Sequence, residues 1–293
     1  MARVEVETDG RVLDAIVSGP DTGLPLVFHH GTPMSNVQFQ PFVDAATERG
    51  LRTITYSRPG YGGSTRHEGR NIADAAWDTR AVLDAVGGQR CVTLGWSGGG
   101  PHALACAALL PDRVAACATL AGVGPFDVED LDFLAGMGDA NVEEFGYVRD
   151  GDDEAMIRFM QAYAQETHDT TPEGVIESLR SLLPPVDMDA LRDELGWFFV
   201  ENDREAFREG IWGWFDDDVA FVRPWGFELS SIEVPVTVWQ GRQDLMVPIA
   251  HGLWLSSHIP AAHAELSDAD GHISLAVGRF GEILDGLIAR AAP

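Results

Sequence analysis

Lysine is missing from this chain of 293 residues, so all 20 of its basic side chains are arginines. Mechanisms that form a Schiff base on lysine, including those that use pyridoxal phosphate, are therefore excluded. Cysteine is scarce as well, because only Cys91, Cys106 and Cys117 occur, widely spaced and within apolar segments. We expect these three to be buried, reduced thiols, and we expect no metal site.

Long hydrophobic runs are also absent. No stretch approaches the roughly 18 uninterrupted apolar residues of a membrane-spanning helix, and the start, MARVEVETDG, does not have the pattern of a signal peptide. Positive charge is in deficit, since 46 acidic residues leave a formal net charge of −26. The electric field of such a negatively charged protein repels the phosphate backbones of nucleic acids and anionic lipid surfaces. We expect a cytoplasmic protein, monomeric or homodimeric, with no nucleic acid or membrane as partner.

Apolar runs typical of buried strands alternate with helical patterns over most of the chain. A hairpin turning at Asp9-Gly10 is predicted to come first. The runs that predict buried strands lie at 24–30, 52–57, 90–96, 114–122, 235–241 and 263–268. Helical periodicity predicts helices at about 36–49, 72–86 (with Asn71 as N-cap), 101–110 and 275–290.

This order predicts an α/β fold with a mostly parallel, doubly wound sheet flanked by helices, in which ligands bind at the carboxyl ends of the strands. The alternation is interrupted between about 125 and 230. That segment has a helical period and no convincing strand, and residues 127–226 hold 26 of the acidic residues but only seven arginines. We interpret 125–230 as an inserted α-helical cap, or lid, and residues 1–124 and 231–293 as the core.

The stretch GWSGGGPH, residues 95–102, fits two motifs. The pattern Gly-x-Ser-x-Gly over 95–99 is typical of a serine nucleophile on a sharp strand-to-helix turn. The pattern Gly-x-Gly-x-x-Ala over 98–103 is typical of a dinucleotide-binding loop. The dinucleotide motif needs an acid about 20 residues further on, at the end of the next strand, to hold the ribose. No acid that could serve occurs there before Asp127. We therefore expect Ser97 to be a nucleophile, and we expect no cofactor.

A serine nucleophile requires a base and an acid that orients the base. His272 and Asp244 each follow one of the last two predicted strands, so both should lie at the edge of the sheet that carries Ser97. The loop FHHGTPMS (28–35) would supply the N–H of Thr32 to an oxyanion, and the turn itself the N–H of Gly98.

Several other polar residues near the predicted site are expected to have lesser roles. We expect His29 and His30 to support the oxyanion loop and His102 to pack within its helix, while Asp127 is an alternative orienting acid to Asp244. Asp268 and Asp270 are expected to be turn residues.

Over nearly its whole length the chain resembles the α/β-hydrolase family. The segments that carry this resemblance are HHGTP (29–33), YSRPGYGGS (56–64), GWSGGG (95–100), GRQDLMVP (241–248) and DGHISL (270–275). The resemblance implies Ser97 as nucleophile, His272 as base, Asp244 as its orienting acid and a cap over the site. It also implies hydrolysis of a small-molecule ester or related acyl bond through an acyl-serine intermediate. Serine at position 97 argues against the branches of the family that attack with an aspartate.

These motifs do not identify the substrate. An aromatic cluster near the end of the cap is either the core of a lid or the roof of an apolar pocket. Candidates for pocket residues are Trp96, Trp212, Trp214 and Met246. Prolyl iminopeptidases, C–C bond hydrolases, cofactor-free haloperoxidases, and receptors that retain the three residues are the alternatives. Thr32 and Met34 depart from the HGGPG motif of the iminopeptidases.

Overall fold

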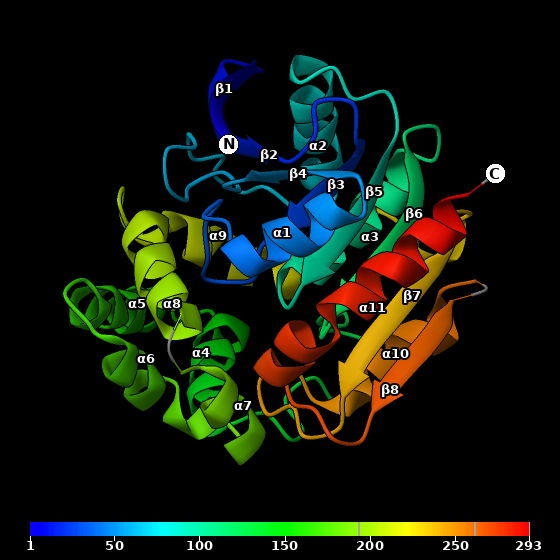
Figure 1. The fold of residues 1–293 in the computed structure, drawn as a ribbon. Helices are drawn as coiled ribbons and strands as arrows, with labels where there is room; N and C mark the ends of the chain where they lie inside the picture. Colours follow the sequence, from blue (N-terminus) through cyan, green and yellow to red (C-terminus); the bar gives the residue numbers. More distant parts are fainter. Residues whose placement is uncertain (193, 261, 293) are drawn as a thin grey trace.

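Eight strands form a single sheet in the computed structural model, which describes residues 1–192, 194–260 and 262–292 (Figure 1). The strands are β1 (Ala2–Thr8), β2 (Arg11–Ser18), β3 (Leu24–His29), β4 (Leu51–Tyr56), β5 (Cys91–Trp96), β6 (Val114–Leu120), β7 (Val236–Gly241) and β8 (His263–Ser267). Their order across the sheet is β1-β2-β4-β3-β5-β6-β7-β8. Strands β3 to β8 pair in parallel, and β1 and β2 pair antiparallel at one end. The predicted α/β fold is confirmed.

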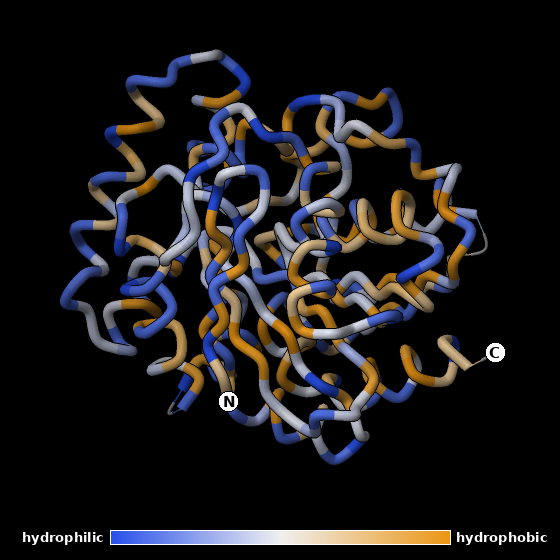
Figure 2. Tube along the Cα trace, turned by 90° about the horizontal axis from the view of Figure 1, so that it is seen from above, coloured by the Kyte–Doolittle hydropathy of each residue, from blue (hydrophilic) through white to orange (hydrophobic). Residues whose placement is uncertain are grey.

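Helices cover both faces of this sheet. One face carries α1 (Gln40–Glu48) and α11 (Ile273–Ala291), and the other carries α2 (Asp74–Ala85), α3 (Gly99–Leu109) and α10 (Ile249–His258) (Figure 1). Each face has its own apolar core, because alternate strand residues point to opposite sides. Apolar segments accordingly run through the middle of the molecule and hydrophilic segments lie around it (Figure 2).

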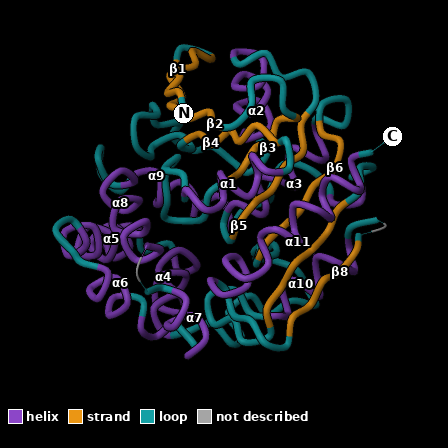
Figure 3. Tube along the Cα trace, viewed as in Figure 1, coloured by secondary structure: helices purple, strands orange, loops and turns teal. Residues whose placement is uncertain are grey.

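The connection from β6 to β7, called here the helical insertion, is wholly helical among its described elements. It contains α4 (Asp139–Asp150), α5 (Asp153–Thr167), α6 (Pro172–Ser178), η1 (Arg180–Leu182), α7 (Pro185–Ala190), α8 (Glu194–Ala206), α9 (Trp212–Phe221) and η2 (Leu229–Ser231). Helices α4 to α8 lie together beside one end of the sheet (Figure 3). Division into core and cap at 124/125 and 230/231 stays a prediction.

The local predictions are confirmed in most places. The hairpin turns at Asp9 and Gly10, both of which have positive φ, and the three cysteines are buried and free. Of the helices described here, none is long and apolar enough to cross a membrane.

The structure differs from the local predictions in three places. Helix α2 starts at Asp74 with Ala73 as N-cap, two residues later than predicted. Asn71 and Asp74 nevertheless exchange the two hydrogen bonds of a capping box, so Asn71 caps the turn that leads into the helix. Strand β8 is half-exposed and not buried, because it is the edge strand of the sheet. Helix α10 was not predicted. Its Gly252 lies so close to β7 that a Cβ there would be 2.7 Å from the Gln240 Cβ.

Candidate active site

Ser97 stands on the sharp turn between β5 and α3, with a left-handed backbone φ of 56°. A non-glycine residue adopts this conformation only when its surroundings enforce it. Here the Ser97 N–H donates to the Leu120 carbonyl at 2.8 Å, and the Gly100 N–H donates to the Ser97 carbonyl at 2.9 Å. A Cβ at Gly95 would lie 2.1 Å from the Gly99 carbonyl oxygen, so the turn requires glycine there.

Asp244 and His272 meet across the ends of β7 and β8. His272 Nδ1 donates to Asp244 Oδ2 at 2.8 Å, and both side chains are buried. The other oxygen, Oδ1, accepts the N–H groups of Met246 and Val247, each at 2.8 Å. Gln240 Nε2 donates to Oδ2 at 3.0 Å. The carboxylate therefore has a fixed orientation, and it holds the imidazole with Nε2 directed away from it.

The charge of His272 depends on two opposing effects. Burial lowers the pKa of the imidazole, but the negative charge of Asp244 and the hydrogen bond to it outweigh burial, and Asp187 adds to the attraction. The pKa of His272 is therefore raised above its usual value. The indole of Trp96 stacks against the ring, with centroids 6.0 Å apart.

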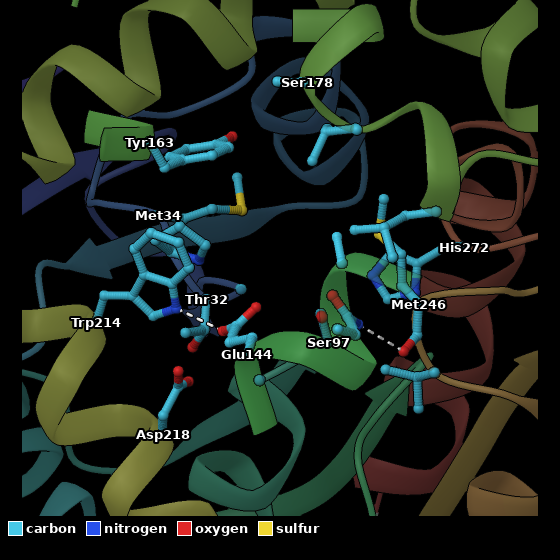
Figure 4. Close-up of a pocket in the computed structure, with 18 of the residues that line it drawn as sticks. Thr32, Met34, Ser97, Glu144, Tyr163, Ser178, Trp214, Asp218, Met246 and His272 are labelled. Carbon is cyan, nitrogen blue, oxygen red and sulfur yellow. Dashed lines mark hydrogen bonds between the residues drawn. The ribbon is translucent and has the colours of Figure 1, made fainter. Parts of the chain in front are cut away.

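Ser97 and His272 line the same cavity, of about 410 Å³, together with Thr32 and Gly98 (Figure 4). We call it the Ser97 cavity. The sheet side supplies these residues and the helical insertion supplies the opposite wall. A cavity of this size suits a small molecule.

Three of the four predicted pocket residues line the Ser97 cavity, namely Trp96, Trp214 and Met246. The prediction for Trp212 was wrong. Its indole is 36% exposed and packs beneath the Arg66 guanidinium, 4.2 Å from the ring centroid, outside the cavity. Residues two apart in a helix point about 200° apart, so only one of Trp212 and Trp214 can face the cavity.

Thr32 and Gly98 lie side by side. A Cβ at Gly98 would be 2.4 Å from Thr32 Oγ1, so only glycine allows this approach. The loop that bears Thr32 is held from behind by Arg58, which donates to the His30 carbonyl at 2.5 Å and to the Gly31 carbonyl at 2.9 Å. Thr32 Oγ1 itself donates to Asp217 at 2.6 Å.

Asp217, on α9, connects the helical insertion to this loop. It is fully buried and accepts hydrogen bonds from Arg58, Arg70 and Tyr61 as well as from Thr32. Burial raises the pKa of its carboxyl, but the two arginines outweigh this effect and hold the pKa well below its usual range. A buried carboxylate with these partners stays ionised, so the network fixes the backbone of the loop.

Of the two histidines expected to support the loop, the structure shows hydrogen bonds to it from the side chain of His30, whereas the His29 ring contacts Cys106. His102 bonds to the Gly98 carbonyl at the start of its own helix. His30 Nδ1 donates to the Gly31 carbonyl at 2.8 Å, and its Nε2 accepts the Arg58 N–H at 3.1 Å. Burial lowers the pKa of His29 to about 3, and it lowers the pKa values of His30 and His102 as well. All three are therefore neutral, and none of them lines the Ser97 cavity.

The rival acids of the sequence lie in other environments. Asp127 is exposed, and it is Asp244 that accepts the hydrogen bond from His272. Asp270 accepts from Ser267 Oγ at 2.6 Å, as a turn residue does, and Asp268 forms an exposed ion pair with Arg242.

A family model described as alpha/beta hydrolase fold matches residues 25–278. The chain is an α/β hydrolase. It is 27% identical over 233 residues to the bifunctional esterase/perhydrolase DCH of Acinetobacter calcoaceticus, covering 78% of each chain. It is 26% identical over 238 residues to a non-heme chloroperoxidase of Burkholderia pyrrocinia, covering 79% of this chain and 78% of that one. An alpha/beta hydrolase fold protein from Nakamurella multipartita superposes with a TM-score of 0.65 at 25% identity, covering 99% of each chain.

No pattern in the sequence indicated one residue that lies near the site of this α/β hydrolase. Asp187, on α7 of the helical insertion, is fully buried and accepts the backbone N–H groups of His272 and Ser274, at 2.7 and 2.8 Å. It also accepts the N–H of Ile273 at 3.1 Å and the hydroxyl of Ser274 at 2.6 Å. Because α11 begins at Ile273, Asp187 acts as a helix cap supplied by a distant part of the chain.

Three further acids of the insertion also escaped prediction. Glu144, Asp203 and Asp218 line the Ser97 cavity, and we call them the carboxyl cluster. For Asp218 the sequence does hold an indication of a special role. The residue belongs to the run Asp216–Asp218, in a helix otherwise composed of aromatic and aliphatic residues and glycine. Acids inside such a helix are either paired or placed at a functional site. No group of three potential ligands in the described part of the chain is arranged to hold a metal ion.

Proposed function

We propose that this α/β hydrolase is a serine hydrolase that cleaves a small-molecule ester or related acyl bond through an acyl-serine intermediate. In this proposal Ser97 is the nucleophile, His272 the general base and then acid, and Asp244 the residue that orients His272. The N–H groups of Thr32 and Gly98 form the oxyanion hole. The proposal rests on one observation above all: a serine with a left-handed φ opens onto the same cavity as a histidine bonded to a buried carboxylate.

Acylation begins when Ser97 Oγ attacks the substrate carbonyl and its proton passes to His272 Nε2. Nδ1 of His272 keeps its proton because it donates to Asp244, and the carboxylate stabilises the imidazolium that forms. The carbonyl oxygen, now negatively charged, accepts from the two N–H groups. His272 then donates its proton to the leaving alcohol as the bond to it breaks.

Deacylation repeats this sequence with water. His272 takes a proton from water, the hydroxide attacks the acyl carbon, and the proton returns to Ser97 Oγ as the acid leaves. The network of Arg58 and Asp217 has no part in these transfers. Its proposed role is to hold the Thr32 loop in position, so that the oxyanion hole exists before substrate binds.

We propose that the helical insertion is a cap that selects the substrate. Its helices contribute Phe145, Phe159 and Trp214 to a cavity wall that is mostly apolar. An apolar or aromatic acyl group would bury its surface there.

The test is a panel of short, long and aromatic esters with aminoacyl amides, run on the wild-type protein and on Ser97→Ala. We expect ester hydrolysis in the wild type, labelling of Ser97 by a fluorophosphonate, and loss of both in the variant. Hydrolysis that survives in Ser97→Ala contradicts the assignment. Turnover of prolyl amides alone would favour the iminopeptidase alternative, and turnover of nothing in the panel would favour the C–C hydrolase or receptor alternatives.

A second candidate activity follows from the relatives named as perhydrolase and chloroperoxidase. Hydrogen peroxide in place of water would attack the same acyl-serine and release a peracid, with the same proton transfers through His272. Peracid formation from an ester and peroxide, lost in Ser97→Ala, would support this activity. Hydrolysis without peracid would exclude it.

A further inference from the structure

One wall of the Ser97 cavity carries three buried carboxyl groups with no described arginine beside them. Glu144 (on α4), Asp203 (on α8) and Asp218 (on α9) are each at least nine-tenths buried, and each lines the cavity. No arginine forms an ion pair with any of them among the residues that the structure describes. Buried carboxyl groups of this kind are costly for a fold and are retained where they bind something.

The run Asp216–Asp218 shows how unusual this is. Asp216 pairs with Arg66 at 2.8 Å, and Asp217 pairs with Arg58 and Arg70 at 2.6 Å each. Asp218 has no such partner. Neither of its carboxyl oxygens makes a hydrogen bond of good geometry with a described group, although the indole N–H of Trp214 and the carboxyl group of Glu144 lie close to it. Figure 4 shows its carboxyl group pointing into the cavity beside Glu144 and Trp214.

The other two carboxyl groups of the cluster are only partly satisfied. Glu144 Oε1 accepts the indole N–H of Trp214 at 2.7 Å, and its carboxyl group is within hydrogen-bond reach of Asp218. Oδ2 of Asp203 has no partner among the described groups. Burial raises the pKa of all three carboxyls, that of Asp203 to about 7, and repulsion by Glu144 further raises that of Asp218. A bound cation would relieve this repulsion.

Aromatic rings surround the same wall. The rings of Tyr163 and Phe159 lie edge-on to Trp214, with centroids 5.3 and 5.9 Å from it, and all three residues line the cavity. Ring faces attract organic cations, and their apolar surface suits the carbon skeleton of such a ligand. A hydrated metal ion gains nothing from these rings, and the cluster does not have the arrangement of a metal site.

We propose that the carboxyl cluster is a subsite for the ammonium group of a small organic amine, with the aromatic wall around the carbons that bear it. The consequence for the substrate rests on the function proposed above. The substrate of Ser97 is then an acyl compound that carries an amine at the end remote from the scissile bond.

Binding is tested first on Ser97→Ala protein, so that the result does not depend on catalysis. Calorimetry compares benzylammonium with benzyl alcohol, which has the same shape and no charge. We expect the ammonium ion to bind at least tenfold more tightly, and Asp218→Asn, Glu144→Gln or Asp203→Asn to reduce that ratio severalfold. The matched control is Glu166→Gln, because Glu166 lines the cavity but is exposed and screened by water.

Catalysis is tested next on the wild-type protein, with methyl 6-aminohexanoate against its neutral isostere, methyl heptanoate. A higher kcat/KM for the amino ester, lost in Asp218→Asn while the neutral ester is still cleaved, supports the subsite. Equal affinity for amine and alcohol overturns it, and so does a preference that survives in all three variants. Ammonium binding without any ester hydrolysis would instead leave the subsite standing and contradict the serine hydrolase.

Discussion

The carboxylate of Asp187 accepts the backbone N–H of His272 at 2.7 Å, although 85 residues separate them. Asp187 belongs to α7 of the helical insertion, and His272 immediately precedes α11 of the sheet layer. The proposed base is therefore held from two sides, by Asp244 at its ring and by Asp187 at its backbone. Displacement of α7 would move the histidine, so the insertion and the proposed chemistry are coupled.

Asp187→Asn tests this coupling through the pH profile. The negative charge of Asp187 helps to raise the pKa of His272, and the proposed base must be neutral, so activity falls as the pH drops through this raised value. Loss of the charge lowers the pKa of His272. We expect the acidic limb of kcat/KM to move toward lower pH, with a severalfold fall in the plateau.

The control for this variant is Asp189→Asn, on the same helix but in an exposed ion pair with Arg192. Its profile should match that of the wild type. An unshifted acidic limb in well-folded Asp187→Asn would limit Asp187 to a purely structural role.

Asp244→Asn should lower kcat by roughly 10⁴-fold while the fold is kept. The amide can no longer both accept from His272 Nδ1–H and satisfy its other neighbours, so the imidazole loses the tautomer that leaves Nε2 free. Circular dichroism and kinetics on the purified variant measure both quantities. A loss of less than tenfold would indicate that another acid orients His272, and Asp127→Asn is the variant to compare.

Gly98→Ala tests the proposed oxyanion hole. The added Cβ would lie 2.4 Å from Thr32 Oγ1 and 2.9 Å from Phe221, so the two proposed donors must separate. We expect kcat to fall by about 10² or more with little change in KM. Gly278→Ala is the control, since its Cβ meets nothing within 4 Å. Similar kinetics for the two variants would contradict the role of Gly98.

Trp214 and Trp212 make a matched pair for substrate selection. Trp214→Phe alters the cavity wall and removes the N–H that Glu144 accepts, so severalfold changes in relative kcat/KM across an ester series are expected. Trp212→Ala should leave these ratios unchanged, because its ring lies outside the cavity against Arg66. A change of ratios in the Trp212 variant and not in the Trp214 variant would reverse the assignment.

Asp203→Asn should stabilise the protein at alkaline pH. Burial raises the pKa of Asp203 to about 7 in the folded state, whereas the unfolded chain has an ordinary, lower value. The folded state thus binds a proton that the unfolded state has lost, and its stability falls as the pH rises from about 4 through about 7. Urea unfolding measures the free energy of unfolding of the variant relative to the wild type. This difference should increase in favour of the variant by on the order of 1 kcal/mol or more from pH 5 to pH 8. A gain that does not depend on pH would mean that Asp203 is charged in the folded state throughout.

The amino-acid sequence by itself determined the order of the strands along the chain, the position of Ser97 on a strand-to-helix turn, and the placement of Asp244 and His272 after the last two strands of the sheet. These features depend on short-range information. The period of apolar residues predicts each element, glycines at 95 and 99 permit the turn, and parallel strands bring their carboxyl ends to one edge.

Only the tertiary structure decided which residues of the helical insertion face that edge. Trp214 lines the cavity and Trp212 does not, Asp187 caps a helix that starts 86 residues later, and of three consecutive acids only Asp218 is without an arginine. Each outcome depends on how a helix is rotated about its axis and on which distant groups pack against it. A local pattern contains neither quantity, because both follow from the packing of the insertion against the sheet layer.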